Sequence, residues 1–364
     1  WQDMPSGDAS VRPGRGEIKR SPESAAIYDR ELKALIDARR NHPCIVMWVP
    51  FNEGWGQFDT VRVTEWVKKY DPSRLVNCAS GWNDFPTGDV HDIHVYRGPG
   101  MPKPEEKRAA VLGEFGGLGL PVRGHTWVES DRNWGYGGAL KSPEELTDTY
   151  LDLIERLHPL IGRGLSAAIY TQTTDVEVEV NGLMTYDRAV VKMPLEKVVA
   201  AHKALAGPPP VVRDLVPTSQ QEPQTWRYTA DKPADDWSKA DFDDASWKTG
   251  PGGFGTAGTP GAVVRTEWKT PDIWLRRSFE MPGHWPGDGQ LRLRLHHDDD
   301  AEVYVNGVLA AKVSGYVTEY QTMRLRPEAA AALRPGRNVF AVHCHQVRGG
   351  QYIDVGLAAL EPAK

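Results

Sequence analysis

Cysteine is scarce in this sequence: its 364 residues include only Cys44, Cys78 and Cys344. Their spacing matches neither a zinc-binding pattern nor the framework of a disulfide-rich domain. Cys44 and Cys78 lie in apolar stretches, which predicts buried free thiols. We therefore expect no metal site and no stabilising disulfides.

Long apolar runs and an excess of basic residues are also missing. No stretch approaches the roughly 20 apolar residues that a membrane-spanning helix needs. The formal net charge is −6, whereas nucleic-acid binders usually present a basic face. No glycine-rich phosphate loop follows a predicted strand. We expect no membrane partner, no nucleic-acid partner and no cofactor. The compartment stays open, with a periplasmic or extracellular place favoured over the cytoplasm.

Residues 1–207 alternate between helical and strand patterns. Ser21-Pro22-Glu23 is typical of a helix start, and residues 44–49 are apolar on both faces, as in a buried parallel strand. The alternation predicts an α/β fold with parallel strands, either a barrel or an open sheet. Further strands are expected to end near Cys78, Tyr96, Gly113 and Thr171, and further helices near 58–70, 142–157 and 195–205.

The pattern changes after residue 207. Residues 208–214 begin with three prolines and are expected to form a stiff linker. Residues 215–364 show short strand patterns separated by turn residues, which predicts an all-β sandwich or jelly roll. Asn306-Gly307 predicts a tight hairpin, and the acidic run at 298–300 is expected in a solvated loop.

Two predicted strands end in a glutamate. Glu53 follows the run at 44–49, and Glu114 follows the run at 109–113. In a parallel barrel, active sites form at this carboxyl edge of the strands. Glycosidic bond cleavage requires a pair of carboxyl groups, one acting as a proton donor. The alternative is that each glutamate only stabilises the start of a helix.

Several motifs resemble glycoside hydrolase family 2, which includes β-galactosidases and β-glucuronidases. They are Asn41-His42-Pro43 followed by Asn52-Glu53, Gly113-Glu114-Phe115-Gly116, Asn181-Gly182 with Asp187-Arg188, and the opening residues 1–5. The resemblance covers about residues 1–200. It implies the C-terminal part of a (β/α)8 TIM barrel, with Glu53 as acid/base after strand four and Glu114 as nucleophile after strand seven.

By the same resemblance, strands one to three and any earlier domains of the same chain would precede residue 1. An open five-stranded sheet would expose a long apolar edge. We therefore expect this chain alone to associate or to be unstable, and to be a weak catalyst at best. The region 215–364 resembles the galactose-binding-like jelly rolls that accompany the family, and we expect it to be a packing partner.

The resemblance also implies roles for other residues. Asn52 would bind the sugar 2-hydroxyl, Tyr96 would hold the carboxylate of Glu114, and His94 would line the sugar pocket. Glu53 would carry a raised pKa, and Glu114 would stay ionised. Tryptophans in nearby loops could stack on substrate or could simply pack, and the last strand carries glutamine where relatives usually carry tryptophan; the residues concerned are Trp55, Trp82, Trp134 and Gln172.

The family's Asn-x-Lys-Gly element, which holds the acid group of glucuronides, is absent. We therefore predict a retaining exo-β-glycosidase, β-galactosidase-like, with an oligosaccharide or glycoside as substrate. The alternatives are a non-catalytic carbohydrate-binding protein on a degenerate barrel, a β-glucuronidase-like enzyme, and an inverting enzyme. Sugar and linkage are not specified by the sequence.

Overall fold

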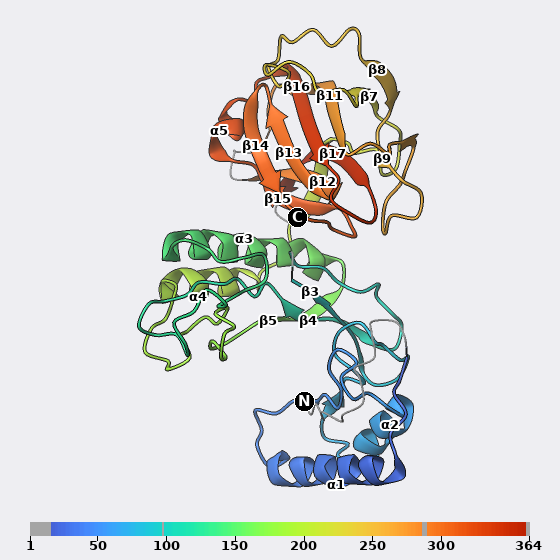
Figure 1. The fold of residues 1–364 in the computed structure, drawn as a ribbon, viewed down its shortest axis with the longest axis vertical. Helices are drawn as coiled ribbons and strands as arrows, with labels where there is room; N and C mark the ends of the chain where they lie inside the picture. The colour runs from blue at the N-terminus through green and yellow to red at the C-terminus, as the bar shows by residue number, and fades with distance from the viewer. Residues whose placement is uncertain (1–15, 97, 286–289, 362–364) are drawn as a thin grey trace. The chain divides into compact units, whose positions relative to one another are not determined.

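The computed structural model describes residues 16–96, 98–285 and 290–361 and divides into two compact units, 1–207 and 208–364 (Figure 1). The resemblance at residues 1–5 lies outside the described residues. None of the described helices combines the length and apolar character needed to cross a membrane. The unit 1–207 holds the candidate site.

The first unit contains the five predicted strands, all paired in parallel. Among the described residues they form two small sheets, one of two strands and one of three, and no closed barrel. The order along the chain is the one expected from the alternating pattern. The strands are β1 (Met47–Trp48), β2 (Leu75–Val76), β3 (Val90–Val95), β4 (Ala109–Phe115) and β5 (Leu165–Tyr170).

The helices of this unit begin close to where their local signals predict, but α3 continues to Gly162, beyond the expected end near residue 157. Ser21 caps α1, and Ser142 caps α3 by accepting a hydrogen bond from the Glu145 N–H at 3.2 Å. Helices α3 and α4 lie side by side (Figure 1). The bounds are α1 (Pro22–Arg39), α2 (Thr60–Tyr70), α3 (Pro143–Gly162) and α4 (Leu195–Ala204).

Two apolar clusters hold the first unit together. One joins α1 and α2 to β1 and β2, and includes Tyr28, Phe51 and Val76. The other joins α3 and α4 to β4 and β5, and includes Leu112 and Tyr150. The carboxyl ends of strands from both clusters point into the region of the candidate site.

The predicted burial of the first strand is wrong at its start. Cys44 is exposed, and Val46 is 66% exposed, although Cys78 and Cys344 are buried. In the described part of the chain, β1 pairs only with β2, so one side of this short sheet has no neighbour to cover it. Apolar character on both faces therefore did not ensure burial on both faces.

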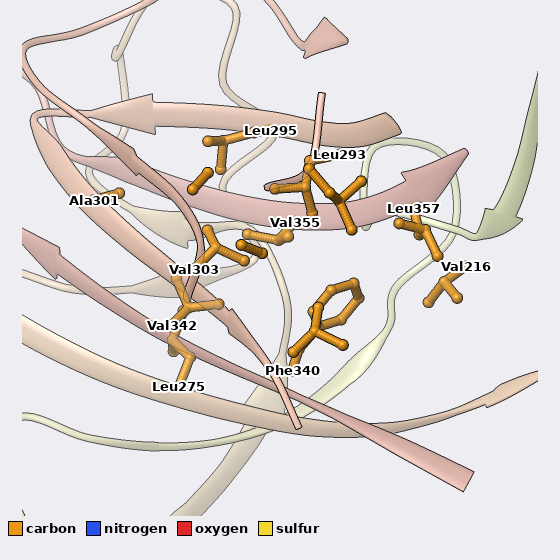
Figure 2. Close-up of a cluster of buried hydrophobic side chains, with 14 of the residues drawn as sticks. Val216, Leu275, Leu293, Leu295, Ala301, Val303, Phe340, Val342, Val355 and Leu357 are labelled. Atoms are coloured by element: carbon orange, nitrogen blue, oxygen red, sulfur yellow. The ribbon is translucent and has the colours of Figure 1, made fainter. Parts of the chain in front are cut away.

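The second unit consists of two six-stranded sheets with one shared core, shown in Figure 2. One sheet has the order β10-β9-β17-β12-β15 with β6 on β17, and the other has the order β14-β13-β16-β11-β7-β8. The elements are β6 (Val211–Val216), β7 (Thr225–Thr229), β8 (Lys248–Pro251), β9 (Phe254–Gly255), β10 (Thr266–Glu267), β11 (Asp272–Met281), β12 (Leu291–Asp298), β13 (Asp300–Val305), β14 (Val308–Val313), β15 (Gln321–Arg324), α5 (Pro327–Ala331), β16 (Gly336–His345) and β17 (Tyr352–Glu361).

The expected hairpin is present. Asn306 and Gly307 join β13 to β14, with φ values of 50° and 86°. Two consecutive positive φ angles suit the two-residue turn that matches strand twist, which explains the Asn-Gly pair.

Two other expectations for this unit are wrong. Residues 211–214 were expected in the linker but belong to β6, which pairs with the edge of β17; only the prolines before them lack the N–H that a sheet requires. Asp298 and Asp299 were expected in a solvated loop but are buried at the junction of β12 and β13. Asp299 tolerates burial because its carboxylate accepts the N–H groups of Val347 and Arg348.

Candidate active site

Glu53 leaves the end of β1 in an unusual backbone conformation. Its φ is 54°, in the left-handed region that residues other than glycine rarely adopt. The Glu53 N–H donates to the carbonyl of Ser80 at 2.8 Å, and Asn52 forms a parallel bridge with Ser80. The segments that follow β1 and β2 are thus held together, and they support a strained conformation at Glu53. Such strain concentrates at functional sites.

Glu114 is aimed by a bulge in β4. Ile93 pairs with Leu112 and His94 pairs with Glu114, so Gly113 is the extra residue on its strand. The Gly113 N–H donates to Oδ1 of Asp92 at 2.9 Å. A Cβ atom at this position would lie 2.1 Å from that oxygen, so only glycine allows the carboxylate to approach.

The two glutamates meet across one short gap. One carboxylate oxygen of each, together with a ring nitrogen of His94, lie within 4.8 Å of one another. The hydroxyl oxygen of Tyr96 lies 3.0 Å from Oε1 of Glu53 and 2.8 Å from Oε2 of Glu114. A phenol has one proton, so Tyr96 donates to only one carboxylate at a time. Thr171 also donates to Oε2 of Glu114, at 3.2 Å.

A chain of polar side chains lies behind Glu53. Nδ1 of His94 is 2.9 Å from Oε1 of Glu53, and Nε2 is 2.7 Å from Oγ of Ser80. Ser80 in turn donates to Oδ2 of Asp92 at 2.8 Å, and Asn77 donates to the same oxygen at 2.6 Å. The His94 side chain is fully buried, so this chain is shielded from solvent.

The pKa of Glu53 is lowered, whereas we expected it to be raised. Burial raises the pKa of Glu53, but the hydrogen bonds from His94 and Tyr96 and the charge of His94 outweigh it, so the pKa is lowered. Burial also raises the pKa of Glu114, and there the charge of His94 and the Tyr96 hydrogen bond only partly offset it. The reason is position: Nδ1 of His94 is 2.9 Å from Glu53 but 3.8 Å from Glu114.

Two of the expected tryptophans flank this cluster. Trp82 places its ring 5.7 Å from that of His94, edge to face. Trp134 packs against Tyr136, which stacks on Tyr96 at 3.5 Å between ring centroids. Both tryptophans remain partly exposed. Their exposed faces are suited to apolar contact with a sugar ring.

The other expected residues differ in how closely they join the cluster. Asn52 is buried, and its amide oxygen has no hydrogen-bond partner within the described ranges. Gln172 follows Thr171 and donates to Oε2 of Glu179 at 3.0 Å. Trp55 is 52% exposed, and no ring contact to the cluster is found for it in the described part of the chain.

Glu179 is a third carboxylate of this region. Burial raises its pKa, the Gln172 hydrogen bond lowers it, and the negative charge of Glu53 raises it further. Burial is the main cause of a raised pKa for Tyr136. The negative charges of Glu179, Glu53 and Glu114 raise that pKa further. The site therefore concentrates negative charge.

Two groups among the described residues have the spacing of metal ligands. One is the set of Glu53, His94 and Glu114 described above, whose members already hydrogen-bond with one another or with Tyr96. The other is Asp84, His91 and Glu105, where the guanidinium of Arg108 pairs with both carboxylates at 2.7 Å. An arginine between two carboxylates compensates their charge. We assign a metal to neither.

Sequence reasoning missed several residues of the site. One signal was available for Asp92: it alternates with the predicted site residues His94 and Tyr96, so the three side chains share one face. Three polar groups on the inner face of a buried strand indicate a polar network. No comparable local signal marks the other missed residues, which are Ser80, Tyr136, Thr171 and Glu179.

Comparison with known proteins gives one consistent family. Residues 10–104 match the model described as glycosyl hydrolases family 2, TIM barrel domain. A β-galactosidase from Klebsiella pneumoniae is 32% identical over 63 residues. That match covers 17% of this chain and 6% of the relative, so the chain corresponds to a small part of the relative's length.

Solved structures show partial similarity. A β-glucuronidase 2 from Bacteroides uniformis, bound covalently to an aziridine, has 19% identity and a TM-score of 0.29, covering 40% of this chain and 18% of that chain. A family 2 glycosyl hydrolase from Bacteroides cellulosilyticus has 14% identity and a TM-score of 0.27, covering 39% and 20%.

The matched family domain contains much of the geometry described above. Residues 10–104 include Glu53, Ser80, His94 and Tyr96, and Glu114 follows ten residues after the matched segment (114 − 104 = 10). Residues 10–104 therefore match the TIM barrel domain of glycosyl hydrolases family 2.

Proposed function

We propose that this chain carries the catalytic centre of a retaining exo-β-glycosidase, β-galactosidase-like, that acts on a neutral sugar. Glu114 is the nucleophile and Glu53 is the acid/base. The observation that carries the proposal is the short gap between the two carboxylates, whose nearest oxygens lie within 4.8 Å. Retaining enzymes hold the two groups about 5–5.5 Å apart, whereas inverting enzymes leave about 6.5–9.5 Å for a water molecule.

The hydrogen bonds support this division of roles. Oε2 of Glu114 faces two hydroxyl donors, Tyr96 and Thr171, which stabilise a carboxylate ready to attack carbon. Glu53 faces His94, a group able to supply a proton. Asn52, the residue before Glu53, would bind a sugar hydroxyl; its buried amide oxygen has no hydrogen-bond partner in the described ranges.

The reaction follows two displacements. In the first, Glu114 bonds to the anomeric carbon while Glu53 protonates the leaving oxygen. In the second, Glu53 removes a proton from water, which attacks the same carbon and releases Glu114. The configuration at the anomeric carbon is inverted twice and is therefore retained.

The charge of the site favours a neutral substrate. Within the described ranges, His94 is the one cationic group found in an ion pair with Glu53 or Glu114. Glu179 adds a third negative charge close by. A uronic acid would bring a further carboxylate into this region without a cation to balance it. The similarity to a curated β-galactosidase agrees with a neutral sugar.

The test is a panel of nitrophenyl β-glycosides on the full-length protein, with galactoside, glucoside, mannoside and glucuronide compared. We expect turnover of a neutral sugar, a product of retained configuration by NMR, and covalent trapping at Glu114 by a 2-deoxy-2-fluoro glycoside. Binding of sugars without any turnover would indicate instead a non-catalytic protein on a degenerate barrel. An inverted product would reject the retaining mechanism.

A further inference from the structure

We propose that Ser80 and Asp92 are positioning residues that hold His94 with its Nε2 protonated, so that Nδ1 stores and returns the acid/base proton of Glu53. This inference rests on the proposed function and deepens it. It gives a role to a chain of hydrogen bonds that runs from Asp92 through Ser80 and His94 to Glu53.

The direction of the hydrogen bonds follows from Asp92. Its Oδ1 accepts the N–H of Gly113 at 2.9 Å, and its Oδ2 accepts the amide of Asn77 at 2.6 Å. Both donors stabilise the ionised carboxylate and oppose burial, which raises the pKa of Asp92. Because a serine hydroxyl has a single proton, Ser80 gives that proton to Asp92 and must accept at its oxygen.

The state of His94 then follows from Ser80. With Oγ of Ser80 as acceptor, Nε2 of His94 at 2.7 Å carries a hydrogen. Nδ1 is therefore the nitrogen that gains or loses a proton, and it lies 2.9 Å from Oε1 of Glu53. One proton lies in this contact, on Glu53 or on His94. A partner of one ring nitrogen sets the tautomer of the other.

Several titratable groups face His94 and Glu53. They are Asp92 from β3, Tyr96 directly after β3, Glu114 from β4, and Glu179 from the segment after β5. Burial raises the pKa of Glu53, yet its hydrogen bonds to His94 and Tyr96 leave it lowered.

The proton balance closes over one turnover. As the bond between C1 and the leaving oxygen breaks, its electron pair goes to that oxygen, which takes the proton from Glu53. Nδ1 of His94 supplies that proton and becomes neutral, while Glu114 bonds to C1. In the second step water loses a proton to Glu53 and attacks C1, the bond to Glu114 breaks, and the proton returns to Nδ1.

The first test is spectroscopic and needs no activity. The full-length protein is labelled with 15N-histidine, and the His94 signals are assigned by their loss in His94→Gln. We expect the Nε2 signal to be that of a nitrogen that carries a hydrogen. An unprotonated Nε2, which would make Ser80 the donor to His94, overturns the proposal even if the protein is an active glycosidase.

The second test is kinetic. Ser80→Ala should lower kcat about tenfold on a methyl or other poorly activated glycoside, leave KM nearly unchanged, and shift the basic limb of the pH profile. With a dinitrophenyl glycoside, which leaves without protonation, the glycosylation step measured by rapid mixing should be almost normal. Equal losses on both substrates, or an unmoved basic limb, would reject the relay.

A matched control separates the relay from general loss of a buried hydroxyl. Thr64 is also buried, and its hydroxyl donates to the carbonyl of Thr60 within α2. Thr64→Val should leave the pH profile and the leaving-group dependence unchanged. If the wild type turns over no glycoside at all, the proposed function fails, while the NMR measurement still decides the state of His94.

Discussion

At the scale of single residues, the site has few hydrogen-bond donors for several acceptor oxygens. Tyr96 has one proton for two carboxylates, and His94 and Glu53 share another. Removing any one donor should therefore abolish its own hydrogen bond and also shift the pKa values of the neighbouring groups. Effects at this scale should appear first in pH profiles and in leaving-group dependence.

Exchanging each carboxylate for an amide should separate the two roles. Glu114→Gln should abolish turnover of every substrate, because an amide cannot form the glycosyl ester. Glu53→Gln should lower turnover of alkyl glycosides by roughly 10²–10⁴-fold while largely sparing the glycosylation step with a dinitrophenyl glycoside. Rapid-mixing kinetics would measure that step directly. Equal losses in the two variants on the activated substrate would show that the roles are wrongly assigned.

Tyr96→Phe should shift the acid limb of the pH profile upward. The Tyr96 hydrogen bond lowers the pKa of Glu114, so its removal should raise a pKa that burial already raises. Because the nucleophile must be ionised, activity should be lost at the acidic end first and recovered at higher pH. The measurement is kcat/KM against pH. An acid limb that stays in place would mean that Tyr96 does not set the ionisation of Glu114.

At the scale of elements, one bulge links the scaffold to the chemistry. Gly113 leaves its N–H out of the regular ladder, and Asp92 satisfies it from the neighbouring strand. The same carboxylate holds Ser80 and Asn77 from the segment after β2. A change in the bulge should therefore alter both the aim of Glu114 and the stability of the first unit.

Gly113→Ala should destabilise the protein and lower turnover. The new methyl group would meet Oδ1 of Asp92 at 2.1 Å, so the strand or the carboxylate must move, at a cost of about 1–3 kcal/mol. Denaturant unfolding of the protein, followed by one probe in each unit, would measure this. Gly283→Ala is the control, because a Cβ there meets nothing within 4 Å. Equal stability of the two variants would contradict the account of the bulge.

At the scale of the whole molecule, the two units have separate cores. In the second unit, the described strands of both sheets pair only with one another, and their buried residues form one cluster. Val216 of β6 belongs to that cluster (Figure 2), although β6 follows directly after the prolines. The unit should therefore need its residues from 208 onward to fold.

Residues 208–364 produced alone should fold in one cooperative transition. The matched comparison is residues 217–364, which lack β6. Its removal leaves the β17 edge without a partner and takes Val216 out of the core, so the shorter chain should unfold at lower denaturant and associate more readily. Urea unfolding and light scattering measure both effects. Identical midpoints for the two chains would mean that β6 contributes nothing to this unit.

Much of the local structure was predictable because its causes are local. The caps at Ser21 and Ser142 and the turn at Asn306-Gly307 depend on residues a few positions apart. The five parallel strands also followed from short patterns of apolar residues. So did the placement of Glu53 and Glu114 at strand ends, since a strand's carboxyl edge is set by its own direction.

Tertiary structure determined the exposure, the hydrogen-bond partners and the pKa values of these residues. The exposure of Cys44, the link from Asp92 through Ser80 to His94, and the approach of Glu179 all arise between segments that lie apart in the sequence. The pKa of Glu53 is lowered, against the expectation, for the same reason. A residue's type sets which proton it can hold, but burial and the nearest partner determine where that proton rests.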